Sequence, residues 1–345
     1  MKNVLIFGSG SIGNHMAYAC RKNRMNVYVT DNSSSALKRM QEKIYPKRYG
    51  FWDKKIHLIK IENVGNLDIF FDIIIIGTPP NTHIPIYNYC KKKLRYKKIL
   101  IEKPLSNYLE KNLKSFQNKI KKDMVFCGYN HSISPSFKFF LNKFNKNKDI
   151  KKIYVNWCEA WDGILNAHFW MKSPYDSYLG DIKQGGGALQ EHSHGLHIMI
   201  LLLKKLNINL NNIKIGSSSI FETNGKKKYD IFSNIIGFHK KIYFNYNTDL
   251  FTFPAEKKIT IVCSNRKYEW ICNFKKNVDL VKITSNEKNI YFKKFVKTRS
   301  SEFENEIKHI LKIKTLTQRN DSNLNPKYAI NTLKLIKKIL KNEHI

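Results

Sequence analysis

The sequence predicts two domains: an α/β domain with a doubly wound parallel sheet, then an α+β domain with an open, mainly antiparallel sheet. Over residues 1–128, short continuous apolar runs alternate with helical stretches, as in parallel strands buried on both faces. Over residues 129–345, longer strands of alternating polar and apolar residues follow one another across short turns, as in an antiparallel sheet. A chain of 345 residues is long enough for two such domains.

The elements follow in order along the chain. Strands of the first domain are predicted at 4–7, 26–30, 71–76, 98–101 and 124–127. Strands of the second domain are predicted at 152–159, 213–222, 229–238, 242–249, 257–263, 268–274 and 278–284. An apolar helix is expected at 189–205, and helices at 302–318 and 326–341 close the chain. We expect the last helix to pack back on the first domain.

The charge is strongly basic, because 61 Lys and Arg against 27 Asp and Glu give +34. The basic residues are mostly Lys, spread from end to end, and Asn, Ile, Tyr and Phe are also abundant. All of these have codons rich in A and T, so a biased genome explains the charge better than a nucleic-acid partner does. We therefore expect no nucleic-acid binding, although the surplus would draw small anions toward a cleft.

The cysteines and the apolar runs indicate the cellular location to expect for the protein. The six cysteines show no Cys-x-x-Cys spacing and lie in apolar runs, as buried reduced thiols do. No apolar run approaches the roughly 18 residues of a membrane span, and no secretion signal is evident. We expect a cytoplasmic protein with no membrane segment.

A glycine motif joins the first strand to the first helix, and an acid ends the second strand. Its predicted cofactor-binding residues are Gly8, Gly10, Ser11, Ile12 and Gly13. This is the dinucleotide-binding pattern of a Rossmann domain, with a tight turn, a close backbone approach to the pyrophosphate and a free helix N-terminus. Asp31, 18 residues after the last glycine, would bind the adenosine ribose and repel a 2′-phosphate, which favours NAD(H) over NADP(H). The alternative is an ordinary turn of small residues.

Two more strand ends carry short motifs. Thr78, Pro79 and His83 form a Thr-Pro-x-x-x-His turn, and Glu102 and Lys103 stand directly before a proline. These motifs resemble the glucose-fructose oxidoreductase and inositol dehydrogenase (Gfo/Idh/MocA) family. The resemblance implies that all five residues lie beside the cofactor and that Lys103 reaches the nicotinamide. A cationic donor there would stabilise the negative charge that develops on a substrate oxygen, although Lys103 could also be a solvated surface lysine.

The crossing into the second domain also resembles that family. Gly128-Tyr129-Asn130 matches it, with Ser132 where the family commonly has Arg. The resemblance places Asn130 among the substrate-binding residues.

A third motif, the glycines 185–187, opens the helix that in this family carries an acid and a catalytic histidine. The family form is Asp-x-Gly-x-His, whereas this chain has Glu191 for Asp, Ser193 for Gly and Gly195 where the histidine would stand. His194, one residue early, is the nearest candidate for a general base, and Glu191 could orient it. A similar Ser-His variant is associated with surface-sugar pathways.

Two other interpretations of this segment stay open. His194 could have a packing role, as is expected for His192 and His197. These histidines and Glu191 also offer nitrogen and oxygen ligands, but residues two apart on a helix point in different directions, so we expect no metal.

The loop 161–182 brings aromatic rings toward the expected cleft. Trp170 and Tyr178 offer the apolar faces and polar tips that suit a sugar ring, and Lys183 could meet a carboxylate or phosphate. Packing of these rings around the loop is an equally good interpretation.

Together the motifs predict an NAD-dependent oxidoreductase acting on CH–OH groups. Its substrate would be a sugar, sugar acid or nucleotide sugar, in keeping with surface-polysaccharide biosynthesis. The alternative is a catalytically silent NAD(H)-binding sensor or scaffold. Family members associate through the second sheet, so the resemblance implies a homodimer or homotetramer.

Overall fold

The computed structural model describes residues 1–144, 149–286 and 290–342, and the chain forms two compact units. The first unit comprises Met1–Ser106, Glu110–Asn130 and Arg299–Ile330. The second comprises Asn107–Leu109, His131–Thr298 and the chain from Asn331 onward. Residues 299–330, which the sequence analysis grouped with the second domain, thus belong to the first unit.

The first unit is built on a six-stranded parallel sheet with the order β3-β2-β1-β5-β7-β8. Its strands are β1 (Asn3–Phe7), β2 (Asn26–Asp31), β3 (Ile56–Lys60), β5 (Ile73–Ile76), β7 (Ile99–Ile101) and β8 (Val125–Cys127). Two further strands, β4 (Phe70–Phe71) and β6 (Arg95–Tyr96), form a separate two-stranded sheet. The order reverses between β1 and β5, which is where open α/β sheets bind their ligands. The doubly wound sheet predicted from the sequence is confirmed.

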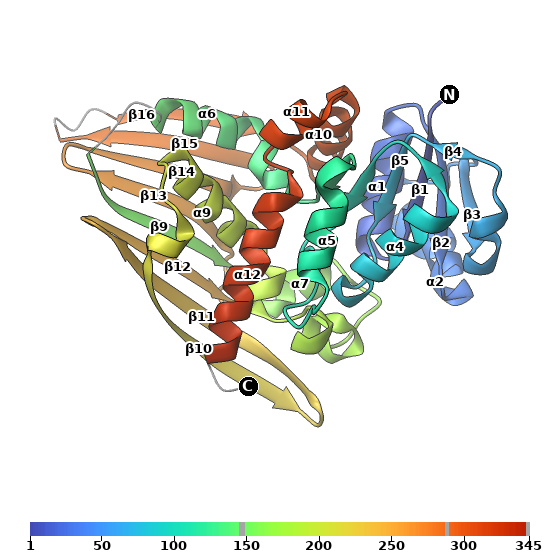
Figure 1. Cartoon of the computed structure of the whole chain (residues 1–345), viewed down its shortest axis with the longest axis horizontal. Helices are drawn as coiled ribbons and strands as arrows, with labels where there is room; N and C mark the ends of the chain where they lie inside the picture. Colours follow the sequence, from blue (N-terminus) through green and yellow to red (C-terminus); the bar gives the residue numbers. More distant parts are fainter. Residues whose placement is uncertain (145–148, 287–289, 343–345) are drawn as a thin grey trace. The chain divides into compact units, whose positions relative to one another are not determined.

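Helices connect and cover this sheet (Figure 1). They are α1 (Ser11–Lys22), α2 (Ser34–Arg39), α3 (Tyr45–Tyr49), α4 (His83–Lys93), α5 (Leu113–Lys119), α10 (Arg299–Lys312) and α11 (Leu316–Asp321). Although α10 comes late in the sequence, it packs on α1, where the rings of His15 and Phe303 stack with centroids 4.9 Å apart.

Lys98 fixes the end of α10. Its ammonium is buried and donates to the carbonyls of Ile310 at 2.7 Å, Leu311 at 3.2 Å and Ile313 at 2.6 Å. The first two belong to the last turn of the helix, where carbonyls lack a partner within it, and the third directly follows its end. One side chain at the start of β7 therefore anchors a helix more than 200 residues later in the chain.

The second unit contains an eight-stranded sheet with the order β10-β11-β12-β9-β13-β14-β15-β16, antiparallel except between β12 and β9. The strands are β9 (Ile150–Cys158), β10 (Lys214–Asn224), β11 (Lys227–His239), β12 (Ile242–Asp249), β13 (Glu256–Cys263), β14 (Arg266–Lys275), β15 (Val278–Ser285) and β16 (Ile290–Val296). The open, mainly antiparallel sheet is confirmed, and β3, β6 and β16 are strands that the sequence analysis missed.

Helices α6 (Pro135–Phe144) and α9 (Ser193–Lys205) pack on this sheet (Figure 1). Trp270 of β14 contacts Phe137 of α6, and Trp157 of β9 contacts His194 of α9. The two indole rings lie 6.0 Å apart, so both helices cover the same face. Shorter helices are α7 (Trp161–Asn166) and α8 (Ala188–Glu191). The final helix, α12 (Pro326–Asn342), starts in the first unit and continues into the second.

The helix expected at 189–205 is divided. His192, with φ −91° and ψ 18°, separates α8 from α9, and its carbonyl accepts a hydrogen bond from the Tyr246 hydroxyl at 3.0 Å. The helix expected at 302–318 is likewise two helices, with Thr315 capping the second through the backbone N–H of Gln318. At each break a side chain hydrogen-bonds to a backbone group, the Tyr246 hydroxyl at the first and the Thr315 hydroxyl at the second.

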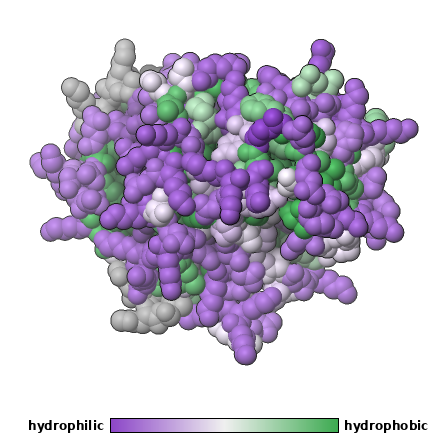
Figure 2. Space-filling view, turned by 45° about the vertical axis from the view of Figure 1, so that its right-hand side comes forward, coloured by the Kyte–Doolittle hydropathy of each residue, from purple (hydrophilic) through white to green (hydrophobic). Residues whose placement is uncertain are grey.

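Hydrophilic residues cover most of the face seen in Figure 2, with small hydrophobic areas between them. Within the described ranges, no helix has the length and apolar character needed to span a bilayer.

Candidate active site

The glycine loop has the geometry that the motif predicts. Gly8 has φ +100°, and a Cβ on it would lie 2.8 Å from the Gly77 carbonyl oxygen. A Cβ on Gly13 would lie 2.0 Å from the Gly8 carbonyl oxygen, so α1 can start this close to β1 only with glycine there. By contrast, nothing lies within 4 Å of the Cβ position of Gly10. The loop is therefore packed tightly underneath and open at the residue where a pyrophosphate would approach.

Two side chains that the sequence analysis did not single out hold this loop. The Asn14 amide is fully buried and donates to the carbonyls of Ser9 at 3.0 Å and Gly10 at 2.8 Å. Arg48 of α3 donates to the Ser11 carbonyl at 3.0 Å and to its hydroxyl at 2.9 Å. The sequence did contain a signal for Asn14, because it is a polar residue on the packed face of α1. Nothing in the sequence connects Arg48 to Ser11, 37 residues earlier.

Asp31, at the end of β2, is tied to the same loop. Its Oδ2 accepts hydrogen bonds from the backbone N–H and the hydroxyl of Ser9, both at 2.8 Å. Its Oδ1 accepts from the N–H of Ser33 at 3.0 Å. The carboxylate is thus fixed beside the glycine turn, at the strand end where Rossmann domains hold the adenosine ribose.

His83 joins the two motif turns at the ends of β5 and β7. Its Nε2 lies 2.7 Å from the Thr78 carbonyl oxygen, and its Nδ1 lies 3.1 Å from that of Pro104. The ring is fully buried, and burial lowers the pKa of His83 to about 4, although the carbonyls favour the charged form. His83 therefore holds Thr78 and the Lys103 turn in register. Pro79, in the same turn, is exposed.

The Glu-Lys-Pro turn follows β7. The Lys103 side chain is half-buried, its backbone N–H lies 3.3 Å from Oε2 of Glu102, and the Lys103–Pro104 peptide is cis. Glu102 is buried against Gly128, whose Cβ position lies 2.8 Å from its carboxyl atoms. Burial, and then the nearby Glu102, raises the pKa of Glu306 of α10 well above its usual range.

Asn130 ends the first unit. It is buried, and its Oδ1 has no hydrogen-bond partner among the described residues. A buried amide oxygen of this kind can accept from a ligand hydroxyl.

In the second unit, the triple glycine lies against Asp230 of β11. Gly187 has φ +89°, and a Cβ on it would lie 2.0 Å from Oδ1 of Asp230. The other oxygen, Oδ2, accepts from the N–H of Leu189 at 2.8 Å and from the Ser233 hydroxyl at 3.1 Å. Asp230 thus holds the start of α8, which carries Glu191. The sequence signal for it was an acid inside an otherwise apolar stretch of strand.

The histidine segment follows. Gly195, where the family histidine would stand, packs so closely on the sheet that its Cβ position lies 2.7 Å from Trp157 and 2.9 Å from Tyr246. His194 is half-buried and lies against Trp157. Glu191 is half-buried as well, and His192 and His197 are buried. The packing explains why position 195 has no side chain, and it leaves His194 as the most exposed histidine of this segment.

The expected substrate residues lie on loops of the second unit. Trp170 is half-buried among His168 and Phe169, with ring centroids 5.3 and 5.2 Å away. Tyr178 is half-buried and the Lys183 side chain is exposed. Tyr175, in contrast, packs on Tyr229, so part of this loop serves packing.

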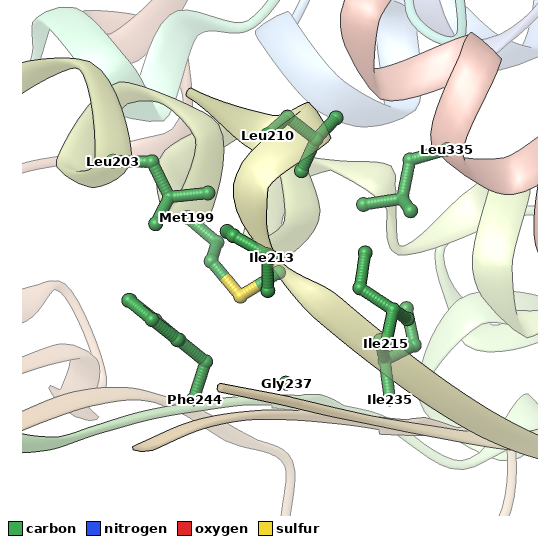
Figure 3. A pocket seen from close by; sticks show the side chains of 9 residues that line it. All are labelled: Met199, Leu203, Leu210, Ile213, Ile215, Ile235, Gly237, Phe244 and Leu335. Carbon is green, nitrogen blue, oxygen red and sulfur yellow. The ribbon is translucent and has the colours of Figure 1, made fainter. Parts of the chain in front are cut away.

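A small cavity under α9 has no part in this chemistry. Figure 3 shows that apolar side chains line it, and it has room for about one water molecule. Its lining consists of Met199, Leu203, Leu210, Ile213, Ile215, Ile235, Gly237, Phe244 and Leu335. Among the described residues, no three His, Cys, Asp or Glu side chains are placed to hold a metal ion.

No protein-family model matches the sequence, and no curated protein matches it. Solved structures do match it over nearly the full length of both chains, at 10% sequence identity. One is KijD10, a 3-ketoreductase from Actinomadura kijaniata in complex with NADP and TDP-benzene, with a TM-score of 0.71 over 99% of this chain and 97% of that one. Another is the UDP-N-acetylglucosamine 3-dehydrogenase GnnA from Acidithiobacillus ferrooxidans, with a TM-score of 0.69 over 98% of this chain and 96% of that one.

A third is the aldose-aldose oxidoreductase from Caulobacter crescentus, with a TM-score of 0.72 over 99% and 97% of the two chains at 10% identity. At this identity the likeness concerns the fold. The chain therefore has the two-domain fold of these sugar oxidoreductases.

Proposed function

We propose that this chain is a nicotinamide-dependent oxidoreductase of the Gfo/Idh/MocA family, acting on a hydroxyl or ketone carbon of a sugar, sugar acid or nucleotide sugar. The observation that carries the proposal is the glycine loop with Asp31, at the switch point of a parallel sheet. The loop is open at Gly10 and tightly packed beneath, which fits a dinucleotide. A nicotinamide bound there would supply hydride transfer.

We propose NAD(H) as the cofactor. The Asp31 carboxylate is held in place by three hydrogen bonds, so a 2′-phosphate would meet a fixed negative charge. The residues that follow, Asn32 and Ser33, offer no cation to offset it. KijD10 was solved with NADP, so the choice between the two cofactors needs a direct titration.

In the proposed mechanism, Lys103 and His194 have different roles at the substrate hydroxyl. The Lys103 ammonium donates a hydrogen bond to the reacting oxygen and stabilises its developing negative charge. During oxidation His194 takes the hydroxyl proton, and during reduction it returns it. Glu191 orients His194. Asn130, Trp170, Tyr178 and Lys183 bind the substrate, for which the polar-tipped aromatic rings and the exposed cation suit a sugar with an anionic group.

The test is turnover of NADH and NADPH with 3-keto nucleotide sugars, and of NAD and NADP with the corresponding alcohols. Lys103→Met should lower kcat by roughly 10²-fold or more while cofactor still binds. His194→Ala should cost about 10²- to 10⁴-fold and remove one limb of the pH profile. Lys92→Met, an exposed lysine of α4, is the matched control. Cofactor binding with no carbonyl-dependent turnover on the panel would favour a silent NAD(H) sensor instead.

We also propose that the protein is a homodimer or homotetramer, assembled through the second unit. Several large apolar side chains of its sheet are exposed, among them Ile236 and Phe238, which point the same way from β11. Burying such side chains between copies would stabilise an assembly. Light scattering of the purified protein should give twice or four times 40.6 kDa.

A further inference from the structure

His194 has a second imidazole directly behind it. The rings of His194 and His131 lie with centroids 4.7 Å apart at 81°, so the edge of one faces the plane of the other. His131 is buried and also contacts Trp157. The protonation state of His131 therefore depends on its neighbours, and a charge on His131 would change the proton affinity of His194.

A buried thiol is the partner of His131. Sγ of Cys272, in β14, lies 3.7 Å from Nδ1 of His131, and Nζ of Lys297 lies 3.4 Å from the same sulfur. Lys297 also forms an ion pair with Asp279 of β15 at 2.9 Å. The three side chains Lys297, Cys272 and His131 thus form a continuous chain that ends on His194.

The far end of this chain is anchored in the core. Asp279 is buried and accepts from the Ser136 hydroxyl at 2.6 Å and the Asn273 N–H at 2.9 Å. Ser136 in turn accepts from the Trp270 indole N–H at 2.9 Å. Because these groups are buried and hydrogen-bonded, they hold the Lys297 ammonium in position.

The donors and acceptors define a direction. An ammonium can only donate, so the Cys272 sulfur accepts from Lys297. The thiol keeps its own proton, which it can donate to Nδ1 of His131 when that nitrogen is unprotonated. A neutral imidazole with an acceptor Nδ1 carries its proton on Nε2. The alternative, a thiolate with an imidazolium, would put a second cation against His194.

We propose that Lys297 and Cys272 hold His131 as a neutral imidazole with the proton on Nε2, and that His131 positions His194 and sets its proton affinity. The function of His194 as proton carrier rests on the proposed activity. The hydrogen-bond chain itself does not. His131 is a positioning residue, since it acts through His194.

Other titratable and aromatic groups of the second unit lie in the same segment as His194 or beside it. On its own helices these are Glu191, His192 and His197. From the sheet, Trp157 of β9 contacts the His194 ring, Tyr246 of β12 donates to the His192 carbonyl, and Glu159 directly follows β9. Glu159 interacts electrostatically with Glu191 and His192 and is paired with Lys257 at 2.6 Å. His131 differs from all of them because its ring contacts the His194 ring while its charge is controlled from the far side.

The test is nitrogen NMR of histidine-labelled protein without substrate, with signals assigned by His131→Gln and His194→Gln. In the wild type, Nδ1 of His131 should resonate as an unprotonated nitrogen and stay so between about pH 5 and 8. In Cys272→Ala, His131 should titrate, and the pKa of His194 should fall by about half a unit or more, because two imidazoliums in contact repel. Cys272→Ser keeps a donor and should restore the wild-type pattern.

Cys263→Ala, another buried thiol of this sheet, is the matched control and should leave both histidines unchanged. A proton on Nδ1 of His131 in the wild type, or thiolate absorption from Cys272, would overturn the proposal even if no variant folds. An unchanged His194 titration in folded Cys272→Ala would do the same. These readouts need no turnover, so they are independent of whether the proposed oxidoreductase activity is found. With a substrate in hand, Cys272→Ala should shift the pH limb of kcat while the KM for cofactor stays the same.

Discussion

A Cβ atom on Gly195 would lie 2.7 Å from the Cβ of Trp157. Position 195 is where the family spacing places a catalytic histidine, and here helix α9 packs too closely on β9 for any side chain. His194, one residue earlier, is half-buried, and its ring lies against Trp157. The contact between α9 and β9 therefore excludes a histidine at position 195, and the motif of this chain has its histidine at position 194 instead.

Gly195→Ala should destabilise the protein by about 1–3 kcal/mol, because the neighbours of the added methyl group are a buried tryptophan and a buried tyrosine that cannot move aside. Urea denaturation measures the change. Gly216→Ala in β10 is the control, since nothing lies within 4 Å of that Cβ position. A Gly195→Ala variant as stable as the control would show that α9 can shift away from β9, and position 195 would again be open to a histidine.

Most of the fold could be predicted from local sequence patterns, whereas the features that were missed depend on contacts between residues far apart in the sequence. The strand, the glycine loop and Asp31 lie within 31 residues, so periodicity and turn chemistry were enough to predict them. Arg48 on Ser11, Lys98 on the end of α10 and Asp230 on the triple glycine each join segments far apart in sequence. A single sequence contains no signal for such pairs. The break of the helix at His192 depends on a tyrosine 54 residues later, for the same reason.

Asp31→Ala should weaken NAD(H) binding and narrow its preference over NADP(H). The substitution removes the proposed ribose acceptor, which is also the carboxylate that holds the Ser9 N–H and hydroxyl, so the glycine loop loses an anchor. Fluorescence titration with both cofactors measures the change. Asp68→Ala, an exposed acid of the same unit, should bind as the wild type does. Tighter binding of NADPH than of NADH by the wild type would contradict the role given to Asp31.

Lys98→Met should lower the free energy of unfolding by about 2 kcal/mol or more. The change leaves carbonyls at the end of α10 without the donor that satisfies them, in a place where the lysine is only 2% exposed. The exposed neighbour Lys97→Met is the control and should change stability little. Hydrogen exchange should also speed up near residue 310. Equal stability of the two variants would mean that water replaces the ammonium without cost.

Asp230 gives the second unit a pH dependence of known sign. Burial raises the pKa of Asp230 to about 7, while the Leu189 N–H and the Ser233 hydroxyl pull it down. In the unfolded chain an aspartate has a pKa near 3.9. Between these values the folded protein keeps a proton that the unfolded chain has lost. The contribution of Asp230 to the free energy of unfolding therefore falls as pH rises from about 4 to about 7, and is constant above.

Asp230→Asn removes this titration while keeping an acceptor for the Leu189 N–H. Relative to this variant, the wild type should be more stable at pH 5 than at pH 8 by about 1 kcal/mol or more, measured by urea denaturation at both values. Ser233→Ala removes a hydroxyl that favours the charged carboxylate, so it should raise the pKa of Asp230 further and extend the fall in stability to higher pH. If the difference between wild type and Asp230→Asn is the same at both pH values, Asp230 is ionised in the fold, and the start of α8 is held by a charge rather than by a neutral acid.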